Sequence, residues 1–160
     1  RKNLGGTREA AQKFYNNYFD QFSGVRDYLE EVKKFALKHS YTETLFGRRR
    51  YFPNINSKIP FLKNMAERTA TNAPLQGTAA DIMKMAMVKV FQECENGKCL
   101  MLLQIHDELL FEVADDIVKE SAVKIQRVME EVAFISVPLL VQVRAGLNWG
   151  EMKKIETQTL

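Results

Sequence analysis

Two adjacent acids, Asp107 and Glu108, are the residues in this sequence best suited to bind a metal ion. They lie between two apolar runs of strand length, residues 100–105 and 109–113, which predict a tight β-hairpin with the acids at its tip. Carboxylate oxygens are the ligands that Mg²⁺ prefers, and a bound cation offsets the repulsion between neighbouring acids. A solvated polar turn, in which Asp107 only accepts hydrogen bonds from the backbone, would have the same sequence.

A second group of polar residues is spaced for one face of a helix. Arg68, Asn72 and Gln76 recur every four residues, so on a single helix they would form a stripe. Their side chains can donate hydrogen bonds to the acceptors that every base pair presents in the minor groove of DNA. An exposed helix face without a ligand would look the same, and a kink at Pro74 would rotate Gln76 off the line.

Three consecutive arginines, Arg48, Arg49 and Arg50, follow Gly47. Guanidinium groups can grip phosphates through charge-assisted hydrogen bonds. Lys63 is a weaker candidate of the same kind. A solvated cluster, or pairing with nearby acids, is an equal alternative for the arginines. This segment is therefore a candidate DNA-binding loop.

Two other residue groups are expected to be structural. Cys94 and Cys99 have no further Cys or His close enough in sequence to complete a familiar zinc pattern, so we expect two reduced thiols beside a turn. A set of aromatic residues has helical spacing, which favours core packing over base stacking. These residues are Tyr15, Tyr18, Phe19 and Phe22.

The elements that would position these groups follow from apolar periodicity and from capping residues. Thr7 is expected to cap the first helix and Gly24 to end it. The successive apolar residues of the hairpin imply strands covered on both faces. Helices followed by a hairpin, a helix and a strand favour an α+β fold, with helices on one face of an antiparallel sheet. The expected elements besides the hairpin are helices over residues 8–22, 25–38 and 61–93, the last with an interruption or kink at Pro74, and a strand over 139–144. A further helix, capped by Asp115 or Asp116, is expected to run to about Phe134.

Composition sets broad limits on the protein class. The 160 residues are 46% hydrophobic, enough for one ordinary core, and the net charge of +3 permits nucleic-acid binding without indicating it. The first residues carry no apolar targeting segment, and no apolar run is long enough to span a bilayer. We therefore expect a soluble protein of a reducing compartment, with no membrane partner. The sequence opens without Met, so we expect a piece of something larger.

Three motifs together resemble successive landmarks of family A DNA polymerases, in the order of the family. They are Gly-Arg-Arg-Arg at 47–50, Asn-Ala-Pro-Leu-Gln-Gly-Thr-Ala-Ala-Asp at 72–81, and His-Asp-Glu at 106–108. Gly-Leu-Asn-Trp-Gly at 146–150 also resembles the terminus of the family. The resemblance covers nearly the whole chain. It implies part of a right-hand polymerase, with residues 1–60 in the C-terminal part of the fingers and 61–160 in the C-terminal part of the palm.

The resemblance also implies roles for individual residues. Asp107 would be the second catalytic carboxylate of the palm, helping to hold two Mg²⁺ ions that lower the pKa of the primer 3′-hydroxyl and neutralise charge on the triphosphate. Glu108 would be a supporting acid. His106 would approach the primer terminus, although a histidine packed at a turn would look the same. Residues of the polar stripe would line the minor groove beside the nascent base pair.

Two parts of the family pattern are missing from this sequence. These are the strand with the other metal-binding aspartate and the helix that handles the incoming nucleotide, and both are expected before Arg1. The partners implied are therefore primer-template DNA, deoxynucleoside triphosphates and the rest of the polymerase chain, in the cytoplasm of a bacterium or in an organelle. We expect no polymerisation by these residues alone. A non-catalytic DNA-binding module, or a structural domain that binds neither DNA nor metal, remains an alternative.

Overall fold

The structure is a computed structural model that describes residues 7–94 and 97–156. Contacts divide the chain into two compact units, Arg1–Thr78 and Ala79–Leu160. The boundary lies inside helix α3 (Pro60–Glu93). The subdomain division at residue 60 stays a prediction. None of the helices in the described part of the chain combines the length and the apolar character that crossing a membrane requires.

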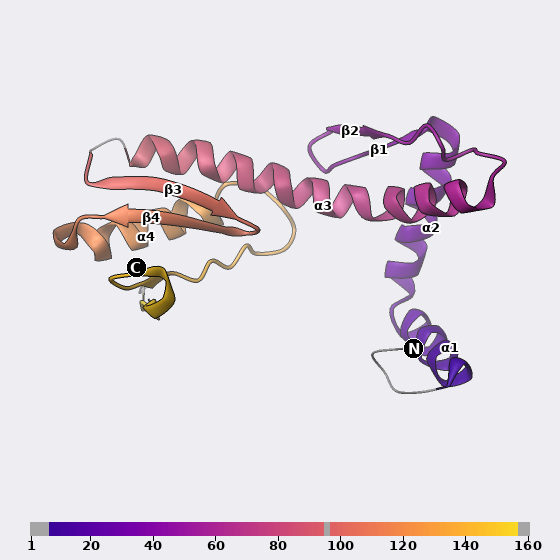
Figure 1. Cartoon of the computed structure of the whole chain (residues 1–160), viewed down its shortest axis with the longest axis horizontal. Coiled ribbons are helices and arrows are strands. Elements are labelled where there is room, and N and C mark those ends of the chain that lie inside the picture. Colours follow the sequence, from indigo (N-terminus) through magenta and orange to yellow (C-terminus); the bar gives the residue numbers. More distant parts are fainter. Residues whose placement is uncertain (1–6, 95–96, 157–160) are drawn as a thin grey trace. The chain divides into compact units, whose positions relative to one another are not determined.

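Two helices open the first unit (Figure 1). Helix α1 (Arg8–Gln21) begins after Thr7, whose hydroxyl accepts a hydrogen bond from the Ala10 amide, so the predicted cap is confirmed. The prediction that Gly24 ends the first helix is wrong, because Gly24 lies in the first turn of α2 (Ser23–His39). The chain turns at Phe22 instead. Its amide closes α1 on the Tyr18 carbonyl, and its carbonyl accepts from the amides of Val25 and Arg26.

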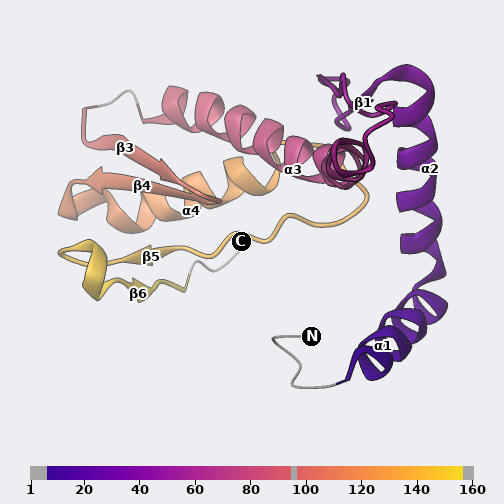
Figure 2. The same ribbon diagram turned by 45° about the vertical axis from the view of Figure 1, so that its right-hand side comes forward.

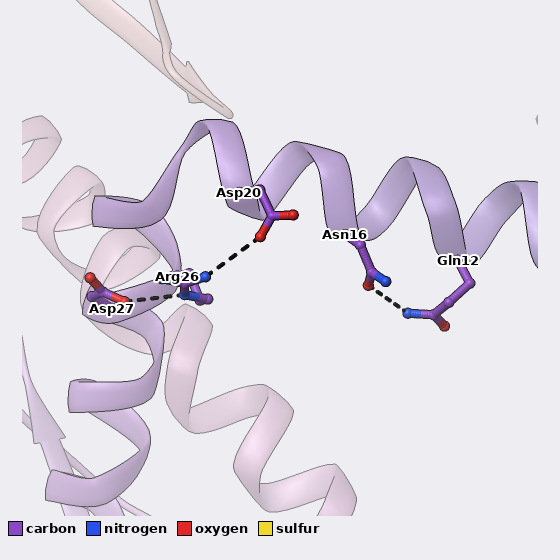
Figure 3. Close-up of polar contacts among 5 residues, drawn as sticks. All are labelled: Gln12, Asn16, Asp20, Arg26 and Asp27. Atoms are coloured by element: carbon purple, nitrogen blue, oxygen red, sulfur yellow. Dashed lines mark hydrogen bonds and ion pairs between the residues drawn. The ribbon is translucent and has the colours of Figure 1, made fainter.

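Most of the aromatic face of α1 is exposed and Phe19 is half-buried, so the prediction that these residues form a core is wrong for the described chain. Tyr15 is 57% exposed and Phe22 is 49% exposed. The rings contact one another along the helix, with Tyr15 and Phe19 centroids 4.7 Å apart. The polar face holds Gln12 bonded to Asn16, and Arg26 of α2 lies 3.8 Å from an Asp20 oxygen (Figure 3). Helical spacing shows that a face is apolar, but it does not show what covers that face.

A short antiparallel pair and the first half of α3 complete the first unit. Strands β1 (Tyr41–Glu43) and β2 (Arg49–Tyr51) pair with Glu43 opposite Arg49. The core contains Ile55, which is 1% exposed, and small side chains of α3. Alanines on α3 permit the close approach of α2 and of the loop after β2. The buried residues of this core are Ala36, Phe52, Ile55, Ala66, Ala70 and Ala73.

Helix α3 runs through Pro74 without the interruption that the sequence suggested. Pro60 is its first residue, a position where proline is favoured because the first amides of a helix have no intrahelical partner. Pro74 lacks the amide that would bond to the Ala70 carbonyl. Pro74 is nevertheless buried, as are Ala70 and Ala73. The helix therefore continues across Pro74 at a point where this side of α3 is packed against the rest of the first unit.

The second unit is built on the predicted hairpin, which the structure confirms. Strands β3 (Cys99–Ile105) and β4 (Glu108–Val113) are antiparallel, and a register shift between Met101 and Leu103 leaves Leu102 as a bulge. Val90 of α3 and Ile125 of α4 (Val118–Glu130) pack with the hairpin in one core. A short 3₁₀ helix, η1 (Asp115–Ile117), precedes α4.

The described residues do not cover the hairpin on both faces, so that prediction is wrong for this part of the chain. Leu100 and Leu103 are 50% and 52% exposed, and Leu102 is exposed as well. Cys99 of β3 and Phe111 and Val113 of β4 pack in one core with residues of α3 and α4. Successive apolar residues on β3 thus leave one set of side chains exposed in the described chain.

The predicted strand over residues 139–144 is wrong for most of its length. Of the described residues 139–145, the part in a ladder is β5 (Arg144–Ala145), which pairs with β6 (Lys153–Lys154) (Figure 2). The 3₁₀ helix η2 (Trp149–Glu151) lies between these two strands in the sequence. Before it, the Val141 amide donates to Glu130 Oε1 at 2.9 Å, and the Val141 carbonyl accepts from Gln126 Nε2 at 3.0 Å. Side chains of α4 thus take the backbone groups that a strand partner would use.

The described strands form three separate two-stranded sheets, β1-β2, β3-β4 and β5-β6. The chain is therefore a mixed helix and sheet structure, as the α+β prediction required. The single antiparallel sheet of that prediction is not present among the described residues.

Candidate metal-binding turn and nucleic-acid surface

The tip of the β3-β4 hairpin is a two-residue turn. Ile105 and Glu108 form the last pair of the ladder, which leaves His106 and Asp107 as the loop. His106 has a φ of 54°, in the left-handed region that costs most side chains roughly 1–2 kcal/mol but that His tolerates better than most. Gln104 Nε2 donates to the His106 carbonyl oxygen at 2.7 Å. A side-chain hydrogen bond therefore fixes the backbone next to Asp107.

The candidate metal ligands are open to solvent. His106, Asp107 and Glu108 are all exposed. Among the residues that the structure describes, no three His, Cys, Asp or Glu side chains are grouped closely enough to hold a metal ion. The donors present are hard oxygens that suit Mg²⁺, an ion that commonly takes one or two carboxylates and completes its shell with water and substrate phosphates. The turn therefore fits one part of a magnesium site.

The polar stripe of α3 lies on one surface of the first unit. Arg68, Asn72 and Gln76 are exposed and line the same hollow of about 380 Å³, together with Leu29 of α2 and Leu75. Pro74 does not separate Gln76 from the other two. The structure therefore brings together the three side chains that the four-residue spacing predicted to share a face.

The three arginines have different surroundings. Arg48 Nη2 donates to the Gly77 carbonyl of α3 at 3.0 Å. Arg49 Nε donates to Glu43 Oε1 at 2.7 Å, and its guanidinium carbon lies 4.6 Å from the centre of the Tyr41 ring. The hydrogen bond to Glu43 is the main reason that the pKa of Arg49 is raised. Pairing with a nearby acid, weighed as an alternative for this cluster, therefore describes Arg49.

Arg50 and Lys63 complete the basic set. The Arg50 guanidinium carbon lies 5.6 Å from the centre of the Phe52 ring. Lys63 Nζ lies 3.9 Å from Glu67 Oε1, one helical turn away. Arg48, Arg50 and Gln76 line a second hollow of about 190 Å³. The loop and the stripe therefore meet at Gln76 within the first unit.

Sequence reasoning missed the residues that hold this loop on α3. The Leu45 amide donates to Thr78 Oγ1 at 2.9 Å. A Cβ atom on Gly77 would lie 2.6 Å from Thr44 Cγ2, so the loop packs where a larger residue would not fit. The available clue was the glycine itself, because Gly inside a helix costs about 1 kcal/mol relative to Ala and usually has a packing reason.

The two cysteines are free and buried, as expected for reduced thiols. Burial, and then a hydrogen bond with Cys99, raise the pKa of the Cys94 thiol to about 12. Both belong to the core of the second unit. They are therefore packing residues.

The family model for DNA polymerase family A matches residues 1–151. DNA polymerase I of Caldicellulosiruptor bescii is 45% identical over 152 residues, which are 92% of this chain and 18% of that protein. DNA polymerase I of Pseudomonas aeruginosa is 43% identical over 152 residues, 94% of this chain and 17% of that protein. The chain therefore spans less than a fifth of the length of these curated relatives.

A solved structure has the same fold. The POL domain of Pol1 from M. smegmatis, in complex with DNA primer-template and dNTP, matches with a TM-score of 0.82 and 43% identity over 86% of this chain and 25% of that one. The family match over nearly all of the sequence agrees with the three motifs and with the confirmed hairpin. The chain belongs to DNA polymerase family A.

Proposed function

We propose that this chain is the C-terminal part of the polymerase domain of a DNA-directed DNA polymerase. The observation that carries the proposal is the exposed Asp107 at the tip of a short hairpin, in a chain that belongs to this family. The intact enzyme would add deoxynucleotides to a primer 3′-hydroxyl under the direction of a template strand. It would act in the bacterial cytoplasm, at the nucleoid, and the relatives named above are bacterial.

The hairpin tip would supply part of the metal-binding site. Two bound Mg²⁺ ions would supply activation of the 3′-hydroxyl and neutralisation of triphosphate charge. Asp107 offers carboxylate oxygens as ligands, and Glu108 places a second negative charge beside them. His106, also exposed at the tip, would lie against the primer terminus. The other ligands would come from the metal-binding aspartate expected before Arg1 and from the nucleotide.

The stripe on α3 would contact the minor groove of the primer-template duplex. Arg68, Asn72 and Gln76 share one open hollow and carry donors suited to acceptors that all correct base pairs present at similar places. Such contacts would report pair geometry without reading sequence. The complex of the M. smegmatis protein with primer-template and dNTP supports these partners.

Among the basic side chains, Arg50 is the best candidate for a phosphate contact. Arg49 is paired with Glu43, Lys63 lies near Glu67, and Arg48 donates to the Gly77 carbonyl. These three would contribute mainly to the shape and the potential of the loop. Phosphate contacts by Arg50 would make DNA affinity depend on salt.

The test is substitution of Asp107 in the full-length protein that carries this chain. We expect Asp107→Ala to slow single-turnover nucleotide addition by roughly 10³-fold or more, because a metal ligand supplies several kcal/mol of transition-state stabilisation. The dissociation constant for primer-template should change by less than about threefold, because a change of that size corresponds to only a small fraction of the binding free energy. Exposed Asp115 at the start of η1 is the matched control, and Asp115→Ala should leave both quantities unchanged.

Two other results would decide against the proposal. If Asp107→Ala leaves nucleotide addition intact, the hairpin tip is not the metal site. If the wild-type protein binds primer-template in a salt-dependent manner but never extends it, the chain is a non-catalytic DNA-binding module.

A further inference from the structure

The residue before Asp107 has an unusual backbone conformation for its type. His106 takes a φ of 54°, and only one other non-glycine residue in the described parts of the chain, Ser40, has a positive φ. Two-residue hairpin turns commonly place glycine or asparagine at such a position. An outlier of this kind persists when neighbouring groups hold it in place.

Gln104 provides such a group. Its side-chain amide donates to the His106 carbonyl oxygen at 2.7 Å, a short bond for a neutral amide donor. Gln104 pairs with Leu109 in the ladder, one step before the last pair. Strand β3 thus holds its own turn through a side chain.

The hydrogen bond acts on the peptide group that leads into Asp107. A peptide unit is planar, so the carbonyl oxygen of His106 lies in one rigid plane with the amide nitrogen and the Cα atom of Asp107. Fixing the oxygen therefore fixes the direction in which the Cα of Asp107 is presented. A metal such as Mg²⁺ demands near-ideal geometry, so small changes in that direction change its binding.

We propose that Gln104 is a positioning residue for Asp107: its amide, bonded to the His106 carbonyl, holds the turn in the one conformation that aims the Asp107 carboxylate at the metal. This inference rests on the proposed function, because it assumes that Asp107 binds a metal. It assigns to Gln104 no contact with the metal. The positioning role requires a hydrogen-bond donor at the end of a side chain as long as that of glutamine.

The experiment measures metal binding as well as activity. In the full-length protein bound to primer-template, the dissociation constant of Mn²⁺ is titrated by EPR for wild type, Gln104→Glu, Gln104→Leu and Asp107→Asn. Gln104→Glu keeps the length of the side chain and replaces its donor nitrogen with an acceptor, whereas Gln104→Leu removes all polar atoms. Exposed Glu112 of β4 lies away from the turn on the same hairpin, and Glu112→Gln is the matched control.

We expect both Gln104 variants to raise the Mn²⁺ dissociation constant about 2- to 10-fold, the effect of losing one hydrogen bond. The Mg²⁺ concentration for half-maximal nucleotide addition should rise in parallel. The melting temperature and the primer-template dissociation constant should not change. Glu112→Gln should match wild type in all four measurements.

The outcomes separate this inference from the proposed function. If Asp107→Asn does not weaken Mn²⁺ binding, the proposed function fails. If Asp107→Asn weakens it but the Gln104 variants do not, the positioning role fails alone. A higher dissociation constant for primer-template with unchanged Mn²⁺ binding would show that Gln104 contacts DNA instead. A lower melting temperature with unchanged Mn²⁺ binding would show that it only stabilises the hairpin.

Discussion

Replacement of Gly77 by alanine tests how the basic loop is held on α3. In an open helix this change would stabilise the protein by about 1 kcal/mol, since Gly is a poor helix former. In this structure the added Cβ would lie 2.6 Å from Thr44 Cγ2 and 3.3 Å from Arg48 Nη2. The first distance is shorter than any ordinary contact between carbon atoms. We therefore expect a change of the opposite sign.

The magnitude follows from what Thr44 would have to give up. Threonine is β-branched, so its methyl can move away only by rotation about χ1 or by a shift of the backbone. Thr44 Oγ1 accepts hydrogen bonds from the amides of Arg48 at 3.1 Å and Phe46 at 3.3 Å, and rotation would disturb both. Overpacking costs about 1–3 kcal/mol. After the gain of about 1 kcal/mol in helix propensity, we expect net local destabilisation of up to about 2 kcal/mol.

Hydrogen exchange in the full-length protein measures this local change. Amides of residues 44–51 should exchange faster in Gly77→Ala, by up to about 30-fold, the factor that about 2 kcal/mol gives. The double variant Gly77→Ala with Thr44→Ser removes the overlapping methyl and keeps the hydroxyl, so it should restore most of the protection. A Cβ on Gly24 would meet nothing within 4 Å, and Gly24→Ala should not speed exchange.

Slower exchange in Gly77→Ala than in wild type would refute the reasoning. Failure of Thr44→Ser to restore protection would also refute it, because the contact with the Thr44 methyl would then not be the cause.

Three further predictions concern the arginines, the cysteines and the isolated chain. Arg50→Ala should reduce the magnitude of the negative slope of log affinity for primer-template against log salt by about 1. Arg49→Ala should leave that slope unchanged, since Arg49 is already paired with Glu43. In the folded chain the pKa of the Cys94 thiol is raised to about 12. The stability that the neutral thiol contributes is therefore complete below the ordinary thiol pKa of roughly 8.5 and is lost as pH rises toward 12. The free energy of unfolding, measured from about pH 7 to 11, should show this loss in wild type and not in Cys94→Ala. The purified 160-residue chain, free of host polymerase, should not extend a primer; extension would contradict the need for a second metal-binding aspartate.

Local features of the sequence predicted much of the structure. Thr7 caps α1, the β3-β4 hairpin has its tip at His106 and Asp107, and Arg68, Asn72 and Gln76 share a surface. In each case the pattern lies within one element or one turn. Residues close in sequence set such geometry directly.

Features that depend on distant partners were not predictable. The contact between Thr44 and Gly77 joins segments that are well separated along the chain. Residues 139–143 have a strand-like sequence, but side chains of α4 bind the Val141 backbone. The exposed rings of α1 show the same limit, because periodicity identifies an apolar face without its partner.

The most direct test of the central claim is a crystal structure of the full-length protein with primer-template, an incoming nucleotide and Mg²⁺. We predict a carboxylate oxygen of Asp107 within about 2.0–2.1 Å of a Mg²⁺ ion that also contacts a nucleotide phosphate. A complex in which the metal ions are fully coordinated and Asp107 contacts only solvent would contradict the claim.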